Sequence, residues 1–210
     1  MADTSVEILN YVNKRNGFYI ECGANDGIEQ SNTRCYETEL GWRGLLIEAS
    51  PIACAKCRTN RSLETNIIEN CALVSSEYKG LTVTGDFDGH PMASIQGARR
   101  SNGLQVEVPA RTLSSILNEH GIEKIDLFSL DVEGYELDVL KGIDFMRHRP
   151  MWMVIEIYEK DFSNVLMFLA HHSYMFHRNL SCFNRWDNPA WDGTHNDYLF
   201  VDAQVPEIGA

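Results

Sequence analysis

Short apolar runs alternate along this chain with longer segments of helical pattern. Ile125–Leu130 and Met151–Ile157 are apolar on both faces, and Thr112–His120 and Tyr135–Lys141 have the pattern of helices. A strand that is buried on both faces belongs inside a parallel sheet, because the helices that connect parallel strands cover both sides of it. The alternation therefore predicts an α/β fold with a mostly parallel sheet and helices on both faces.

The length and composition favour one domain over residues 1–210. The chain has 210 residues, 44% hydrophobic and 23% charged, and no Pro-, Gly- or Ser-rich linker divides it. In its first half the expected elements are a helix from Thr4 or Ser5 to about Asn13, a strand over 18–22, a helix over 29–40, a strand over 43–48, a helix from Pro51 and a strand over 66–74.

Two regions depart from the alternation. Residues 75–110 carry alternating apolar positions around a glycine-rich loop, which predicts a β excursion. After a helix over 162–172, the segments Tyr174–Leu180 and Tyr198–Asp202 are joined by a loop too short to hold a crossover helix. We therefore expect them to form an antiparallel pair at one edge of the sheet.

The charge and the hydropathy pattern exclude several classes of protein. A formal net charge of -12 opposes the phosphate neutralisation on which nucleic-acid binding depends, so neither DNA nor RNA is an expected partner. No apolar run approaches the roughly 20 residues of a membrane span. The first residues, Met1 to Ser5, lack the basic and apolar regions of a signal peptide. We expect a cytoplasmic protein.

The cysteine pattern favours free thiols. Two of the six cysteines lie in expected buried strands of an intracellular chain. Cys54 and Cys57 have the spacing of half a zinc or redox site, but no second pair completes it, so no metal is expected there. The six are Cys22, Cys35, Cys54, Cys57, Cys71 and Cys182.

Acidic and glycine residues follow the expected strands. The loop Gly23–Gly27, Glu48, Asp131 and Glu156 each fall at the carboxyl end of a strand. Ligands of open parallel sheets bind beyond those ends, so one cleft can collect all four.

The spacing of these residues indicates a nucleoside cofactor. Glu48 lies 25 residues beyond Gly23, where an acid commonly accepts hydrogen bonds from ribose hydroxyls. The first loop is GxxxG rather than GxGxxG, and Asp26 inside it and Glu21 before it disfavour a diphosphate. No GxxxxGK[ST] loop occurs either. S-adenosylmethionine, which has an adenosine, no phosphate and two positive centres, fits the acids best.

Four stretches in order resemble the FkbM family of S-adenosylmethionine-dependent methyltransferases. They are Phe18-Tyr-Ile-Glu-Cys-Gly-Ala-Asn-Asp-Gly27, Leu46-Ile-Glu-Ala-Ser-Pro51, Arg111-Thr-Leu-Ser-Ser-Ile116 and the signature Asp131-Val-Glu-Gly-Tyr-Glu-Leu-Asp-Val-Leu-Lys-Gly142. The resemblance implies the Rossmann-like class I fold with a seven-stranded sheet, and methyl transfer to oxygen on a sugar, glycan or natural product. Ser129, where the family often has lysine, and the polar Glu21-Cys22 depart from the family pattern.

The expected cofactor site draws on three loops. The resemblance places the first loop under the cofactor, with Glu21 contacting the ammonium or standing as a surface acid. Glu48, beside Ala49, is the expected ribose acceptor, and position after the third strand puts Cys71 and Ala72 near the adenine edge. The predicted set is Glu21, Gly23, Ala24, Asn25, Gly27, Glu48, Ala49, Cys71, Ala72 and Asp131.

The expected catalytic residues are Asp131, Glu133 and His195. Asp131 can orient the acceptor hydroxyl and accept its proton, while Glu133 shares this task or organises the turn. His195 and His90 lie on loops that can cover the cleft, and Trp186 and Trp191 can stack on a sugar or pack.

Two rival functions stay open at this point. Glu156 and Asp131 can form a divalent-metal site, as in metal-assisted O-methyltransferases. A non-catalytic nucleoside-binding module is the other, because a fold does not dictate function.

Overall fold

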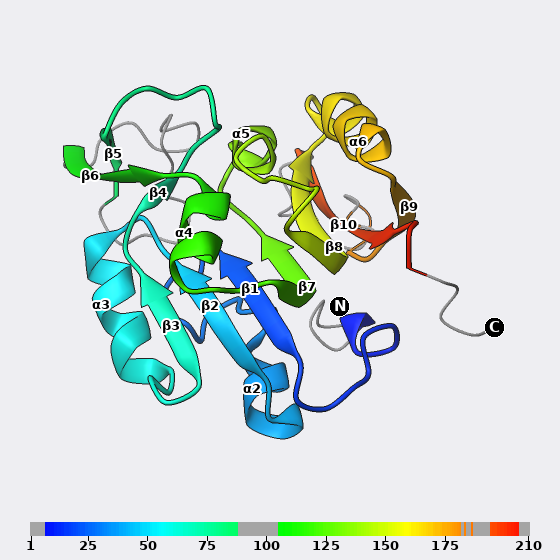
Figure 1. Ribbon diagram of the computed structural model, residues 1–210, viewed down its shortest axis with the longest axis horizontal. Coiled ribbons are helices and arrows are strands. Elements are labelled where there is room, and N and C mark those ends of the chain that lie inside the picture. The colour runs from blue at the N-terminus through cyan, green and yellow to red at the C-terminus, as the bar shows by residue number, and fades with distance from the viewer. Residues whose placement is uncertain (1–6, 88–104, 182, 184–185, 187–193, 206–210) are drawn as a thin grey trace.

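The computed structural model describes residues 7–87, 105–181, 183, 186 and 194–205. Its centre is a seven-stranded sheet, shown in Figure 1. From one edge to the other, the strands are β3 (Asn66–Glu69), β2 (Arg43–Ile47), β1 (Phe18–Cys22), β7 (Lys124–Leu130), β8 (Arg149–Tyr158), β10 (His195–Asp202) and β9 (Tyr174–Asn179).

The sheet is parallel except at one strand. β1 lies between β2 and β7 and pairs parallel with both, and β7 and β8 also pair in parallel. β10 pairs antiparallel with β8 on one side and with β9 on the other. The predicted mostly parallel sheet and its antiparallel pair at one edge are therefore confirmed.

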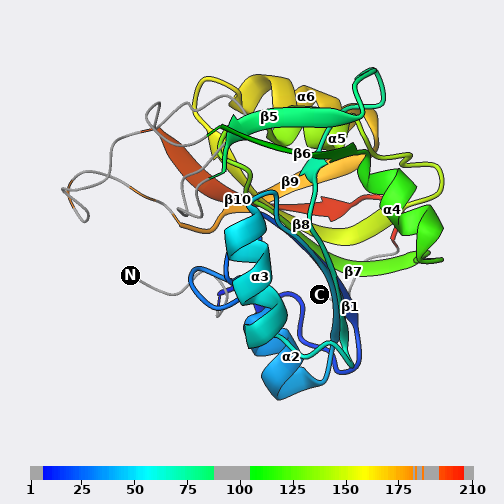
Figure 2. The ribbon, with the colours of Figure 1, turned by 90° about the vertical axis from the view of Figure 1, so that its left-hand side faces the viewer.

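Helices pack on both faces, as predicted. On one face α2 (Arg34–Leu40) and α3 (Pro51–Asn60) bury Tyr36, Cys54 and Cys57 against β1 and β2. On the other face the helices are α4 (Leu113–Glu119), α5 (Glu136–Leu140) and α6 (Phe162–His171), which share one large core cluster with the sheet. In Figure 2 strands β1 and β7 pass between α3 and α4. Alternate residues of β1 thus enter two separate cores, Tyr19 one and Ile20 the other.

The expected single strand over 66–74 was wrong, because the chain bends at Asn70. The Asn70 side chain donates hydrogen bonds to the carbonyl oxygens of Glu48 (2.8 Å) and Ala49 (3.0 Å), which ties it to the end of β2. The chain then leaves the sheet as β4 (Ala72–Leu73).

The β excursion is a second, three-stranded sheet. β4 pairs parallel with β6 (Gln105–Arg111), and β6 pairs antiparallel with β5 (Thr82–Asp86). Its small core includes Val83, Phe87 and Val108. The predicted β excursion thus contains β5 and β6 as an antiparallel pair, and β6 also pairs with β4.

Two expected helices begin or end elsewhere. The segment expected to be helical to Asn13 is helical only at Glu7 and Ile8 in the described residues, and turns follow. α2 begins at Arg34 rather than at Glu29, because residues 31–33 take an irregular path around the carboxylate of Glu21. Among the described residues, none of the helices has the length and apolar character needed to cross a bilayer.

Candidate active site

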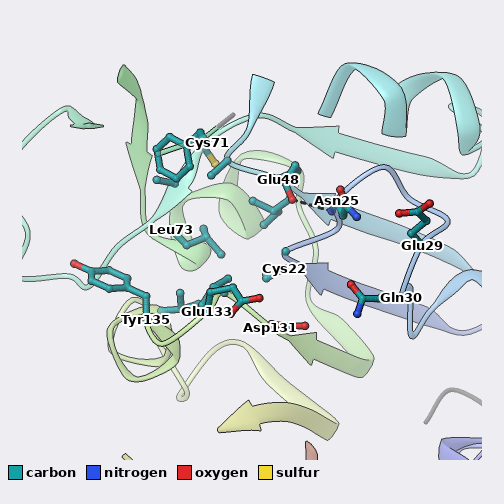
Figure 3. A pocket seen from close by; sticks show the side chains of 17 residues that line it. Cys22, Asn25, Glu29, Gln30, Glu48, Cys71, Leu73, Asp131, Glu133 and Tyr135 are labelled. Atoms are coloured by element: carbon teal, nitrogen blue, oxygen red, sulfur yellow. Dashed lines mark hydrogen bonds between the residues drawn. The ribbon is translucent and has the colours of Figure 1, made fainter. Parts of the chain in front are cut away.

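A cavity opens at the carboxyl ends of β1, β2 and β7, at the edge where parallel-sheet ligands bind. Figure 3 labels ten of the residues that line it. Four segments at the ends of strands line it: Cys22, Gly23 and Asn25; Ile47, Glu48 and Ala49; Cys71, Ala72 and Leu73; Asp131, Val132 and Glu133. Glu29, Gln30, Phe87, Tyr135 and Val139 complete the wall.

The loop after β1 and the turn after β7 press against each other. Gly23 has φ +81°, and a Cβ atom there would lie 1.7 Å from the carbonyl oxygen of Asp131. The backbone N–H of Asp131 donates to the carbonyl oxygen of Cys22 at 3.0 Å. Only glycine fits this approach, so Gly23 fixes the distance between the two segments that carry the cavity floor.

Glu48 lines the cavity and also holds the loop. One carboxylate oxygen accepts from the backbone N–H of Asn25 (2.8 Å) and the other from that of Ser50 (2.7 Å). Burial raises the pKa of Glu48 despite these hydrogen bonds. Each oxygen keeps a second lone pair, so the carboxylate can still accept from a ligand hydroxyl.

Glu21 lies behind the loop rather than on the cavity wall. Its carboxylate accepts from the hydroxyls of Ser31 and Thr33 and from the backbone N–H of Asn32 (2.8 Å). Because side chains alternate along β1, Glu21 and the cavity-lining Cys22 point to opposite faces. The structure thus gives Glu21 a supporting position, and its predicted contact with a cofactor stays a prediction.

Ala24 and Gly27 also lie outside the described cavity wall. Ala24 is buried in the core cluster on the α2 and α3 side of the sheet. Gly27 has φ +80°, and a Cβ atom there would meet the Arg61 side chain at 2.7 Å. Both residues shape the loop from behind.

The sequence analysis did not predict a role for Arg61. It is buried at the end of α3, pairs with Glu37 and with Glu21 (3.5 Å), and donates to the carbonyl oxygen of Gly27 at 3.0 Å. The guanidinium outweighs the effect of burial and lowers the pKa of Glu37. One buried cation thus joins α2, α3 and the loop. Nothing near Arg61 in the sequence signals this partner set.

Five titratable side chains gather beside the turn after β7. Oxygen atoms of Asp131, Glu133 and Glu156 all lie within 4.8 Å of one another. The Tyr158 hydroxyl donates to Glu133 at 2.8 Å, and His195 Nε2 lies 3.6 Å from Glu156. The fold therefore brings the three expected catalytic residues and Glu156 to one place.

The cavity wall is apolar near Cys71 and Ala72, the residues predicted to lie beside the adenine. Leu73 and Tyr135 line the cavity, and Phe87 reaches it from the end of β5. Phe87 and Tyr135 were not predicted, although Tyr135 lies inside the signature. Trp186 is 94% exposed, and His90 and Trp191 lie outside the described residues.

Four of the described cysteines are free thiols, as expected: Cys22, Cys54, Cys57 and Cys71. Cys22 and Cys71 line the cavity, and burial raises the pKa of Cys71 to about 12. Burial likewise raises the pKa of Cys57, the second residue of the CxxC pair, to about 12. These thiols are therefore neutral at pH 7, which does not suit a nucleophile.

Comparison with known proteins identifies the family. The model of the methyltransferase FkbM domain matches residues 21–176. A curated relative, methyltransferase sdnD from Sordaria araneosa, is 43% identical over 54 residues, which are 22% of this chain and 21% of that protein. The chain thus matches about a fifth of the length of that relative.

Two solved structures share the fold. Methyltransferase FkbM from Methylobacillus flagellatus KT superposes with a TM-score of 0.54 at 16% identity, over 89% of this chain and 43% of that one. Aeropyrum pernix fibrillarin, solved with natively bound S-adenosyl-L-methionine, has a TM-score of 0.51 at 11% identity, over 90% of this chain and 67% of that one. Their sheets support the Rossmann-like assignment.

Proposed function

The chain belongs to the FkbM methyltransferase family, and we propose that it transfers the methyl group of S-adenosylmethionine to a hydroxyl oxygen of a sugar, glycan or natural product. The observation that carries this proposal is the composition of the cavity. A glycine loop, a half-buried carboxylate at the end of β2 and an apolar wall meet at the carboxyl ends of the central strands.

The cavity suits the parts of this cofactor. Glu48 stands where the ribose hydroxyls of a nucleoside would bind, and Leu73, Phe87 and Tyr135 offer an apolar surface to the adenine. Asp131 and Glu133 favour the positive sulfonium and ammonium groups. The fibrillarin structure supports the same cofactor class, since that protein binds S-adenosylmethionine and has the same fold.

The proposed reaction is a direct displacement. The acceptor oxygen attacks the methyl carbon, the carbon–sulfur bond breaks, and S-adenosylhomocysteine leaves with the electron pair. Alignment of the two reactants supplies much of the acceleration. Asp131 accepts the hydroxyl proton directly, or His195 beside Glu156 does so, with a contribution of roughly 10²–10⁴-fold.

Metal assistance is the second candidate, and one observation favours it. Sequence reasoning offered Asp131 and Glu156 as two carboxylate ligands, and the structure adds Glu133 as a third within reach. Carboxylate oxygens are the ligands that Mg²⁺ and Ca²⁺ prefer, and a bound cation would lower the pKa of an acceptor hydroxyl. Turnover that is abolished by EDTA and restored by Mg²⁺ would establish this variant, and turnover that EDTA leaves intact would remove it.

Calorimetric titration with S-adenosylhomocysteine tests the proposal, with NADH as the comparison ligand. We expect micromolar binding of S-adenosylhomocysteine, no binding of NADH, and loss of affinity in Glu48→Ala. Glu64→Gln, which removes an acid from an exposed position, is the control and should bind as the parent does. Failure of the folded parent to bind S-adenosylhomocysteine would overturn the cofactor assignment.

A screen of hydroxylated acceptors then separates an enzyme from a binding module. Methylated product from a sugar or natural-product hydroxyl supports the proposed transfer. Cofactor binding without any product would support the non-catalytic rival.

A further inference from the structure

The signature turn between β7 and α5 has a backbone that must be held in place. Glu133 has φ +57° and Gly134 has φ +97°, so two consecutive residues are in the left-handed region. A residue with a side chain avoids this region unless its surroundings impose it. The turn that presents Asp131 and Glu133 to the cavity is therefore not a conformation that the sequence adopts by itself.

A buried carboxylate imposes this conformation. One oxygen of Glu136 accepts from the backbone N–H groups of both Val132 (3.1 Å) and Gly134 (2.9 Å), the two residues that flank Glu133. The Glu136 side chain is 2% exposed and does not line the cavity. Its hydrogen bonds to the turn are made to the backbone.

The other end of the turn is already fixed. Asp131 donates its N–H to Cys22, and its carbonyl oxygen lies against Gly23. With one end held by β1 and the other by Glu136, the position of Glu133 between them is determined. We propose that Glu136 is a positioning residue that sets the turn after β7 so that Asp131 and Glu133 face the bound cofactor and acceptor. This inference rests on the proposed function.

The hydrogen-bond pattern defines the decisive variants. Because a single oxygen of Glu136 accepts both bonds, Glu136→Gln can keep them with its amide oxygen, whereas Glu136→Met fills a similar volume and has no such acceptor. We expect Glu136→Gln to bind S-adenosylhomocysteine as the parent does. We expect Glu136→Met to bind about tenfold more weakly or worse, since displacement of binding groups by about 1 Å is costly.

A control separates positioning from loss of stability. Ile116→Val deletes a methyl group from the fully buried core under α4 and lowers the melting temperature without touching the turn. All variants are titrated at a temperature at which each is folded by circular dichroism. If Glu136 contributes only to stability, Ile116→Val and Glu136→Met should both bind S-adenosylhomocysteine as the parent does when they are folded. If Glu136 positions the turn, binding should be weaker in Glu136→Met alone. Exchange of the Val132 and Gly134 amide hydrogens should also quicken in that variant.

The outcomes distinguish the two proposals. A parent protein that does not bind S-adenosylhomocysteine contradicts the proposed function itself. A parent that binds, together with a folded Glu136→Met that binds equally well, overturns the positioning role and leaves the function standing. Where Glu136→Met does not fold, Glu136→Asp replaces it: the shorter side chain keeps the charge but cannot reach both amides, and unchanged affinity there would overturn the inference.

Discussion

The loop after β1 and the turn after β7 form the same cavity floor, and each is held by a buried glutamate in a different way. Glu21 shares its environment with the buried cation Arg61, which also pairs with Glu37. Glu136 bonds only to backbone N–H groups in the described contacts, and no ion pair of Glu136 is found in the part of the chain that the structure describes. One segment is held in part by ion pairs to a buried cation, the other by a buried carboxyl group that has no cation among its described contacts.

Because of this difference, we expect the two segments to respond differently to mutation and to pH. A buried charge network is costly to break, because removal of one partner leaves the others unpaired in an apolar environment. A buried carboxyl group without a cation is instead sensitive to pH, and burial raises the pKa of Glu136 to about 7. We therefore expect the first loop to fail by unfolding and the second to respond to pH.

The largest effect is expected for Arg61→Met. It leaves Glu21 and Glu37 without their cation and should lower the free energy of unfolding by roughly 3–5 kcal/mol, measured by urea denaturation. Arg58→Met, an exposed arginine of the same helix, is the control and should cost less than about 1 kcal/mol. Equal decreases in the free energy of unfolding of the two variants would contradict the conclusion that buried ion pairs hold the first loop.

Gly23→Ala should come next, because it pushes the two segments apart. The new Cβ atom overlaps the carbonyl oxygen of Asp131, so we expect a loss of roughly 3 kcal/mol of stability and roughly 100-fold weaker binding of S-adenosylhomocysteine. Gly121→Ala is the matched control: its φ is +63°, but a Cβ atom there meets nothing within 4 Å. If both substitutions cost the same, backbone strain rather than contact between the segments explains the effect.

The pH dependence of stability should differ between the parent and Glu136→Gln. Because the folded-state pKa of Glu136 is raised, the native state holds a proton that the unfolded state releases. The stability from this group is complete below about pH 4.5 and is lost as the pH rises to about 7, on the order of 3 kcal/mol. Glu136→Gln should lack this decline in urea titrations at several pH values. Parallel curves would show that Glu136 does not titrate in this range.

Tyr158→Phe should have the smallest effect. It removes the hydroxyl that donates to Glu133, which should cost about 1 kcal/mol of stability and leave the turn in place if Glu136 holds it. Tyr78→Phe, which removes an exposed phenol that donates to the carbonyl oxygen of Thr82, is the control and should be nearly neutral. Loss of S-adenosylhomocysteine binding in Tyr158→Phe would indicate that Tyr158, rather than Glu136, holds the turn after β7.

The sheet was predictable because its signals are local. β1 was expected over Phe18–Cys22 and has those bounds, since an apolar run ends there at a glycine that must adopt positive φ. The position of the cavity followed from topology, because the carboxyl ends of parallel strands share one edge. The bend at Asn70 was not predictable, since it depends on bonds to carbonyl groups that lie more than twenty residues away.

The supporting residues were harder to predict than the wall. The alternation of side chains in β1 already implies that Glu21 and Cys22 cannot both face the cavity, and this signal could have been used. Arg61 could not have been found, because its partners Glu21 and Glu37 come from distant segments of the chain. Glu136 lies within the signature, but its bonds depend on the left-handed conformation of Glu133, which no propensity favours.

Because β10 runs antiparallel to its neighbours, the position of His195, a proposed catalytic residue, depends on the register of this strand. Every parallel strand brings its last residues to the cavity edge, whereas β10 brings its first, so His195 pairs with Tyr158 and Asp197 with Glu156. A slip of one position would present Asn196 in place of His195 and turn each side chain of the strand to the opposite face. Leu199 and Phe200, which enter different cores, penalise such a slip. Packing of these two residues in the two cores therefore fixes the register of β10, and with it the position of His195, which lies in neither core.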